Sequence, residues 1–294
     1  MNEDFEKAAV EIKKLLKAEG KRVYSHKDLV TFLRLERGSW GQYQKGETVE
    51  NVILELLDEG YIERVKLAHD KSKKEFIRYN FDNPSPYEVA QSLQKGAYLS
   101  HGSAVFIHGL NNQLPKTVYL NKEQSKKAPL SGQLSQGSID RAFSKKQRES
   151  LFRLSYKDCE IVLLSGKNTG RFHVLEIEKE GQLLQVASIE RTLVDITVRP
   201  NYAGGTSQVL EAYKGALGRI SVNSLQAVLK KLAYVYPYHQ AVGFYLERAG
   251  YPEEQITWMK ERFSLQFDFY LEYAIPEKSR EYSKDWCLFY PKGL

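Results

Sequence analysis

The sequence has little cysteine and no long apolar run, and each shortage excludes a class of protein. Its two cysteines, Cys159 and Cys287, have no metal-like spacing and are too few for a disulfide framework. This usage is typical of a reducing compartment. The charged, amphipathic stretch at residues 1–16 resembles neither a signal peptide nor a membrane span. We therefore expect a cytoplasmic protein with no membrane partner.

A strong excess of one charge is also missing. Among 294 residues, 43 basic and 37 acidic side chains give a net charge of +6, which mildly favours an anionic partner. The excess is not evenly spread. Residues 1–86 hold 16 basic and 16 acidic groups, and the rest of the chain holds 27 and 21. Apolar residues make up 42%, a proportion that can supply cores for two domains.

Residues 1–83 are predicted to form three short helices followed by two strands. Apolar residues recur with helical period from Phe5 to Leu16, Ser25 is a candidate N-cap, and a third helix follows the Gly38–Gly41 break. YIERVKLA and KEFIRYNF alternate like the strands of a hairpin. This order predicts a winged helix-turn-helix domain.

The hairpin carries a basic cluster that could lie along a DNA backbone. From Arg64 to Arg78 it has six basic groups and only two acidic ones, Asp70 and Glu75. The third helix has an acidic outer face, so base contacts are expected near its N-terminus, and a solvated surface or a protein-binding module stays open. The predicted DNA-binding residues are Gln44, Lys45, Thr48, Asn51, Lys71, Lys73, Lys74 and Arg78.

The segment FDNPSPYE, with Pro84 and Pro86, predicts a short, stiff linker to a second domain at residues 87–294. Ser100 is a candidate N-cap there, and LQFDFYLEYAI predicts a closing strand. The fold class is therefore α+β, with the winged helix followed by a larger mixed α/β domain. Other strands are expected at KTVYL, 159–164, 171–177 and 182–187, and helices at 208–217, 224–235, 238–249 and 253–262.

Two motifs in the second domain carry a family resemblance. YLSHGSAVFIHGL precedes a Pro-Lys-Thr strand, and ASIERTLVDITVRPNYAGG follows about 90 residues later. Together, behind a winged helix, they resemble the AbiEi family of antitoxins from abortive-infection, type IV toxin-antitoxin systems. The resemblance implies two activities without catalysis or cofactor. The protein would neutralise a nucleotidyltransferase-like toxin, and it would repress its own operon by binding inverted repeats in promoter DNA.

Glu190, Arg191 and Asp195 look like a catalytic constellation, but each has a structural explanation. Ser188 can cap the helix, Glu190 suits its first turn, and Arg191 can pair with Asp195 at i, i+4. No nucleophile or metal ligand lies nearby in the sequence. We therefore interpret the group as scaffolding, with Arg191 organising a nearby loop, and we keep an enzyme using Glu190 and Asp195 as a weaker alternative.

Two further motifs do not lead to a site. VLLSGKNTG resembles a phosphate-binding loop, but it lacks the first glycine, and Asn168 follows Lys167 where Ser or Thr is needed. His101 and His108 lie two helical turns apart without cysteines or paired carboxylates, so no metal site is predicted.

A basic segment runs from residue 116 to 148. The prediction is open between a solvated loop and a surface that contacts an acidic toxin or DNA. The candidate contact residues are Lys116, Lys126, Lys127, Arg141, Lys145, Lys146 and Arg148.

For the whole protein, the competing function is a ligand-responsive transcription regulator without a toxin partner.

Overall fold

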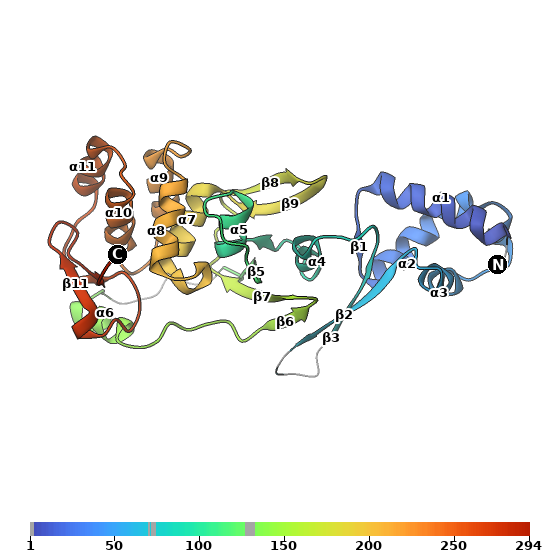
Figure 1. Cartoon of the computed structure of the whole chain (residues 1–294), viewed down its shortest axis with the longest axis horizontal. Helices are drawn as coiled ribbons and strands as arrows, with labels where there is room; N and C mark the ends of the chain where they lie inside the picture. Colours follow the sequence, from blue (N-terminus) through green and yellow to red (C-terminus); the bar gives the residue numbers. More distant parts are fainter. Residues whose placement is uncertain (1–2, 70, 72–74, 127–132) are drawn as a thin grey trace. The chain divides into compact units, whose positions relative to one another are not determined.

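The computed structural model describes residues 3–69, 71, 75–126 and 133–294 (Figure 1). The chain is a mixed α/β protein that divides into two compact units. Unit 1 comprises Met1–Gly96, Phe152–Ile161 and Glu178–Leu184, whereas unit 2 comprises Ala97–Leu151, Val162–Ile177 and Gln185–Leu294. The boundary expected near Pro84 thus falls inside unit 1. Within the described part of the chain, no helix is long and apolar enough to cross a membrane.

Three helices form most of the core of unit 1, and their apolar faces follow the predicted helical period. Two of them start at side-chain caps. Ser25 accepts a hydrogen bond from the backbone N–H of Asp28, and Thr48 accepts one from that of Asn51. The helices are α1 (Glu3–Glu19), α2 (His26–Leu35) and α3 (Val49–Asp58).

The segment between α2 and α3 is a kinked 3₁₀ stretch, η1 (Glu36–Lys45). Its kink lies at Gly41, whose φ of 63° is the left-handed conformation that glycine adopts without strain. Trp40 and Tyr43 are buried, and the Tyr43 ring lies 5.5 Å from that of Phe5. The segment around the predicted Gly38–Gly41 break is therefore packed into the core of unit 1.

Four short strands lie wholly within unit 1. The expected hairpin pairs antiparallel, with Arg64 opposite Tyr79, and its second strand also pairs with β1. The pairing of Ala68 with Ser155 joins a strand that was not expected from the sequence. The strands are β1 (Val23–Tyr24), β2 (Glu63–His69), β3 (Glu75–Asn80) and β6 (Arg153–Tyr156).

The predicted linker is instead the start of a helix, α4 (Pro86–Ser92). Ser85 and Glu88 form a capping box, and Pro86 stands at the first helical position, where its missing N–H costs nothing. Arg22 donates to Glu88 at 2.9 Å. These contacts tie the end of the predicted stiff linker into unit 1, whereas residues 81–85 lie outside helices and strands.

Five more strands form the rest of the sheet. Three of them, β7, β8 and β9, contain some residues that are assigned to unit 1. The pairing of the five is mixed, because β4 is antiparallel to β5 and parallel to β9, with Leu99 opposite Val186. All nine strands belong to one sheet in the order β1-β3-β2-β6-β7-β5-β4-β9-β8. The strands are β4 (Tyr98–Leu99), β5 (Thr117–Glu123), β7 (Cys159–Gly166), β8 (Val174–Lys179) and β9 (Gln182–Ala187).

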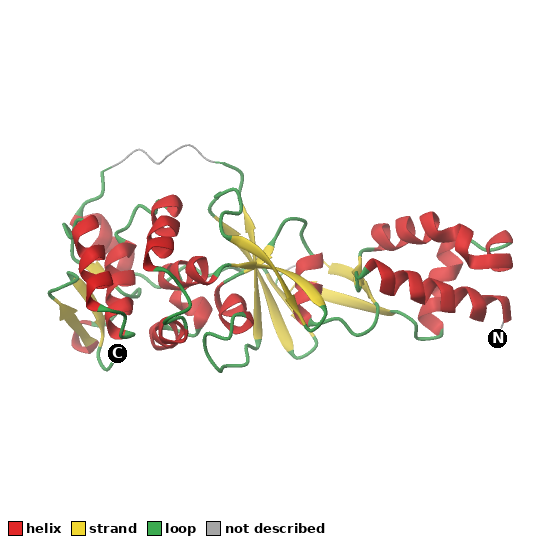
Figure 2. Ribbon diagram, turned by 90° about the horizontal axis from the view of Figure 1, so that it is seen from above, coloured by secondary structure: helices red, strands yellow, loops and turns green. Residues whose placement is uncertain are grey.

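Unit 2 has its core around one central helix. Every residue of this helix from Arg191 to Val198 is buried, and α5, α8, α9 and α10 pack around it (Figure 1). Figure 2 shows helices gathered toward the C-terminus, next to the strands. The helices are α5 (His101–Ile107), α6 (Gln136–Phe143), the central α7 (Ile189–Val198), η2 (Pro200–Ala203), α8 (Thr206–Gly215), α9 (Val222–Leu232), α10 (Tyr238–Arg248) and α11 (Glu253–Arg262).

A second sheet of three strands lies near the C-terminus. The predicted closing strand contributes only β10 (Phe269–Tyr270), which runs parallel to β12 (Leu288–Pro291). A short η3 (Glu277–Ser279) leads into β11 (Arg280–Ser283), which is antiparallel to β12. The sequence pattern gave no sign of the last two strands.

Candidate functional site

Arg191 in α7 is the centre of a buried polar network in unit 2. Its guanidinium has five N–H hydrogens, and five acceptors surround it within hydrogen-bond distance. Because every donor has an acceptor, the buried charge is compensated on all sides. The acceptors are the Phe172 carbonyl at 2.6 Å, Thr169 Oγ1 at 2.7 Å, the Tyr98 hydroxyl at 2.8 Å, and Glu123 Oε1 and Asp195 Oδ2 at 3.4 Å each.

This network joins the two motifs that carry the family resemblance. Tyr98 belongs to YLSHG and Arg191 to SIERT, and their hydrogen bond spans 93 positions. The two motifs also meet where His108 Nε2 lies 2.7 Å from the Ala187 carbonyl. Arg191 further holds the loop before β8 through Thr169 and Phe172, as the sequence analysis expected of it.

Glu123 at the end of β5 supplies one counter-charge to Arg191. Burial by itself raises the pKa of this carboxyl. Hydrogen bonds from the Thr169 hydroxyl and from the backbone N–H groups of Thr169 and Arg171, together with the Arg191 charge, outweigh burial and lower the pKa below its usual value. Glu123 is therefore ionised at neutral pH.

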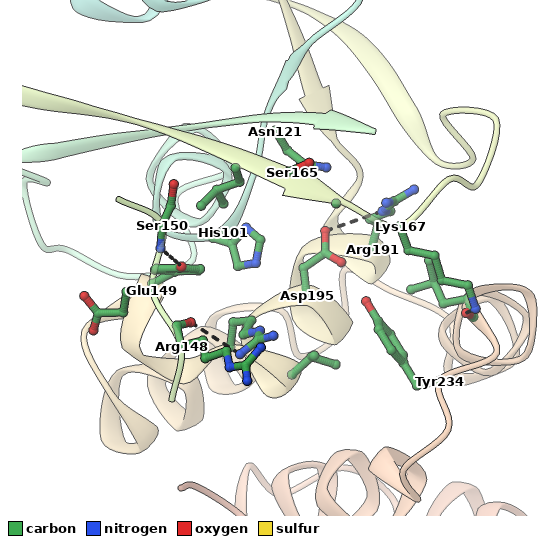
Figure 3. Close-up of a pocket in the computed structure, with 16 residues that line it drawn as sticks. His101, Asn121, Arg148, Glu149, Ser150, Ser165, Lys167, Arg191, Asp195 and Tyr234 are labelled. Carbon is green, nitrogen blue, oxygen red and sulfur yellow. Dashed lines mark hydrogen bonds and ion pairs between the residues drawn. The ribbon is translucent and has the colours of Figure 1, made fainter. Parts of the chain in front are cut away.

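Asp195, one turn after Arg191, has the opposite balance. Burial raises the pKa of its carboxyl to about 6, although the Arg191 charge and hydrogen bond lower it. Figure 3 shows the Tyr234 hydroxyl directed toward this carboxyl. His101 lies on the same hollow, and burial, assisted by the charges of Arg199 and Arg191, lowers its pKa to about 3. The imidazole is therefore neutral at physiological pH.

Glu190 does not take part in this network. Its carboxylate accepts a hydrogen bond from the Ser188 hydroxyl at 3.0 Å and lies 3.9 Å from His173 Nδ1. Ser188 also caps α7, as predicted, by accepting from the Arg191 N–H. No group of three or more His, Cys, Asp or Glu side chains suited to a metal is found among the residues that the structure describes.

A hollow of about 420 Å³, here called the central hollow, opens beside the network (Figure 3). Its lining includes His101, Arg191 and Asp195, together with Lys167 and Tyr234. The first four of these side chains make hydrogen bonds within the protein. The central hollow can thus receive a small polar molecule.

Lys167, from the segment that resembles a phosphate loop, has a structural partner. Its ammonium donates to the Leu232 and Ala233 carbonyls at 2.6 and 2.8 Å, at the C-terminal end of α9. A cation at this end of a helix satisfies free carbonyls and suits the helix dipole.

Four of the predicted toxin or DNA contact residues gather around a second hollow of about 380 Å³, here called the basic hollow. Lys116 lines a different hollow, with Gly102 and Asn201. Lys126 is exposed, and Lys127 lies outside the described residues. The four that meet are Arg141, Lys145, Lys146 and Arg148, and Arg199 joins them.

Arg199 is the member of this group that the sequence analysis missed. In the sequence it stands directly before Pro200, and in the structure it is the C-cap of α7. Its guanidinium lies 6.0 Å from the centre of the Tyr273 ring. A basic residue next to a helix-ending proline was the only available signal, because Arg148 is 51 positions away.

The predicted DNA-binding residues of unit 1 differ in their surroundings. Thr48 is the N-cap of α3, and Asn51 donates to Glu47 Oε2 at 3.0 Å. Lys71 is exposed. Arg78 is only 7% exposed and donates to the hydroxyl and carbonyl of Ser92, so its charge does not face a ligand and the prediction for it is withdrawn. The side chains of Gln44 and Lys45, and all of Lys73 and Lys74, lie outside the described residues.

Comparison with known proteins gives a likeness in fold. No protein-family model matches the chain, and no curated protein matches it. In structure it is similar to the RV2827C protein from Mycobacterium tuberculosis, known from a crystal structure. The TM-score is 0.59, the identity is 15%, and the match covers 96% of this chain and 91% of that one. At this identity the likeness concerns the fold alone.

Proposed function

We propose that this protein is an antitoxin that restrains a nucleotidyltransferase-like toxin and represses its own operon. The observation that carries the proposal is the contact between Arg191 and Tyr98. It joins the two motifs that resemble the AbiEi family into one buried network, although they are far apart in the sequence. Motifs that occupy one site in this way support the resemblance more than motifs scattered over the fold would.

The DNA-binding part of the proposal is assigned to unit 1. Three helices followed by an antiparallel hairpin, with the sheet order β1-β3-β2, fit a winged helix-turn-helix. The hairpin turn carries Lys71 and, outside the described residues, Lys73 and Lys74. These cations would contact phosphates. Two protomers would occupy the two halves of an inverted repeat, because one small domain reads few base pairs.

The outer face of α3 favours a second candidate for unit 1. Glu50 is exposed and lies 3.7 Å from Arg34 Nη2, and Leu54 is 58% exposed one turn further on. Carboxylates repel phosphate, and an exposed leucine is common in protein contacts. Unit 1 as a protein-binding module is therefore the alternative, and a failure to bind promoter DNA would favour it.

The toxin-binding part is assigned to unit 2. Arg141, Lys145, Lys146, Arg148 and Arg199 would provide a basic surface for an acidic face of the toxin, and steering between opposite charges would speed the encounter. A regulator that binds a small ligand and has no toxin partner would use the same two units. The neighbouring reading frame distinguishes the two, because only the antitoxin requires a nucleotidyltransferase-like partner there.

Co-expression with the adjacent gene tests the proposal directly. We expect the full chain to restore growth to cells that express the neighbouring toxin, and purified chain to shift a promoter fragment in a gel. Arg191→Lys is a useful companion variant, because it disturbs the network that joins the motifs. Normal lethality in the presence of soluble, folded full-length chain would refute the antitoxin assignment.

A further inference from the structure

The basic hollow of unit 2 has an unusual lining. Five cations surround about 380 Å³ of space, and no carboxylate lines the hollow among the described residues. They come from α6, from the segment that follows it and from the end of α7, so the fold brings them together. Asp140, the only acidic residue of α6, accepts hydrogen bonds from Gln136 and Tyr270 and does not line the hollow.

None of the five cations forms an ion pair with any residue that the structure describes. The nearby carboxylates of Glu149 and Asp195 line the central hollow instead. Arg199 Nη1 makes one long hydrogen bond of 3.5 Å, to the backbone carbonyl of Arg148. Like charges gathered around one space repel each other, and an anion placed among them removes that repulsion. The hollow therefore fits a ligand with several negative charges.

Three arginines give the hollow a preference for phosphate. A guanidinium offers paired N–H groups that match two oxygens of one phosphate group, whereas an ammonium is a point charge. Arg141, Arg148 and Arg199 supply three such groups, and Lys145 and Lys146 are exposed cations beside them. A nucleic-acid strand carries about one charge every 3.4 Å along an open line. Five cations around a hollow suit a short chain of phosphates better.

The central hollow adjoins the basic hollow, since Arg148 and Arg199 line both. It provides the Tyr234 ring and polar groups, which a phosphate chain does not need. Each hollow lies within the size range of small-molecule sites, and together they accept a longer ligand. We propose that unit 2 binds a nucleoside polyphosphate, with its phosphates in the basic hollow and its base against Tyr234. This goes beyond the proposed function and does not rest on it.

Titration of the full chain with ATP that carries a fluorescent N-methylanthraniloyl group on its ribose tests the inference. At 150 mM salt we expect saturable binding that unlabelled ATP displaces. Replacing both shared arginines, as Arg148→Gln with Arg199→Gln, should weaken binding at least tenfold. Because Arg199 is partly buried, Lys145→Gln with Lys146→Gln serves as a second variant at exposed positions, with an expected loss of at least threefold.

Controls separate a specific site from general attraction to a basic protein. Lys214→Gln with Lys278→Gln removes two exposed cations of unit 2 outside both hollows and should change affinity less than twofold. Tyr234→Ala should weaken ATP binding but leave the affinity for inorganic tripolyphosphate unchanged. Melting temperatures confirm that each variant is folded.

Three results would overturn the inference. The first is no saturable binding of labelled ATP by folded wild-type protein. The second is equal affinity for tripolyphosphate and ATP, because the base would then contribute nothing. The third is displacement of labelled ATP by a 12-base-pair duplex at a lower concentration than by ATP, which would make the hollow a nucleic-acid surface. None of these depends on whether the toxin is neutralised, so the failure of one proposal is distinguishable from failure of the other.

Discussion

The Arg191 guanidinium donates to the Tyr98 hydroxyl at 2.8 Å, and this bond joins β4 to α7 inside unit 2. The same hydroxyl accepts from Asn121 at 2.7 Å and lies 3.2 Å from Glu123 Oε1. Tyr98 and Arg191 thus share Glu123 as a common partner. Groups that share partners in this way are expected to be energetically coupled.

Arg191→Lys should destabilise the protein by about 3 kcal/mol. An ammonium has three hydrogens for the five acceptors that now surround the guanidinium, and a buried polar group left without a partner costs about 1–3 kcal/mol. Urea unfolding followed by circular dichroism measures the change. Arg34→Lys, at an exposed ion pair, is the matched control and should cost less than about 0.5 kcal/mol. Equal stabilities for the two variants would contradict the network.

Gly243→Ala should destabilise unit 2 by about 3 kcal/mol. A Cβ at this position in α10 would lie 2.0 Å from the Trp286 ring, which is itself buried, so the helix or the ring must move. Gly137→Ala in α6 is the control, because its Cβ would meet nothing within 4 Å. That variant should be neutral or stabilised by up to about 1 kcal/mol. Thermal unfolding of both variants checks the difference.

His101→Asn should reduce the loss of stability in acid. Folding lowers the pKa of His101 from its ordinary 6.5 to about 3, so the unfolded chain binds a proton in this window and the folded protein does not. Stability therefore falls as the pH drops from 6.5 toward 3, by up to about 1.4 kcal/mol per pH unit. Asparagine is chosen because it tolerates the positive φ of 49° at this position. Parallel pH curves for wild type and variant would refute the assignment.

Changing Lys71, Lys73 and Lys74 together to alanine should weaken binding to the protein's own upstream DNA. Each phosphate contact removed should also reduce the slope of log K against log salt by about 0.9. Gel-shift titrations at several salt concentrations measure both effects. Arg78→Gln is not an informative companion, because Arg78 is buried against Ser92 and its loss would act through folding. An unchanged affinity at every salt concentration would rule out the hairpin as a DNA contact.

Reversing the charges of Arg141, Lys145, Lys146 and Arg148 to glutamate should reduce rescue of toxin-expressing cells by at least tenfold in colony count. All four residues are exposed, so the fold should survive. Lys214→Glu with Lys278→Glu is the control and should rescue fully. Full rescue by the quadruple variant would remove the basic surface from the proposed mechanism.

Local signals in the sequence predicted much of the fold. The bounds of β9 and α11 agree with those expected, and Ser25 and Ser188 are caps as predicted. Such features depend on residues close together in the chain. Pro86 was misinterpreted because a proline is equally compatible with a linker and with the first position of a helix.

The candidate site was harder to predict, because its contacts join distant segments. Periodicity placed Arg191 on a helix beside Asp195, but it could not identify Tyr98, Glu123 or Thr169 as partners. The alternating pattern placed Arg78 on a strand, as observed. Its partner Ser92 belongs to α4, a helix that was not predicted from the sequence. The pairing of Arg199 with the basic segment likewise required the tertiary structure.

The parallel pairing of β4 with β9 has a consequence for the order of folding. Leu99 cannot pair with Val186 until the ribosome has made nearly two thirds of the chain. The segment between these two residues forms a long loop, and such a loop is slow to close. A nascent polypeptide that stops before residue 186 thus has the three amino-terminal helices but lacks the pairing of β4 with β9 and all of the central helix α7. Translation pauses before that point should therefore raise degradation of the incomplete chain.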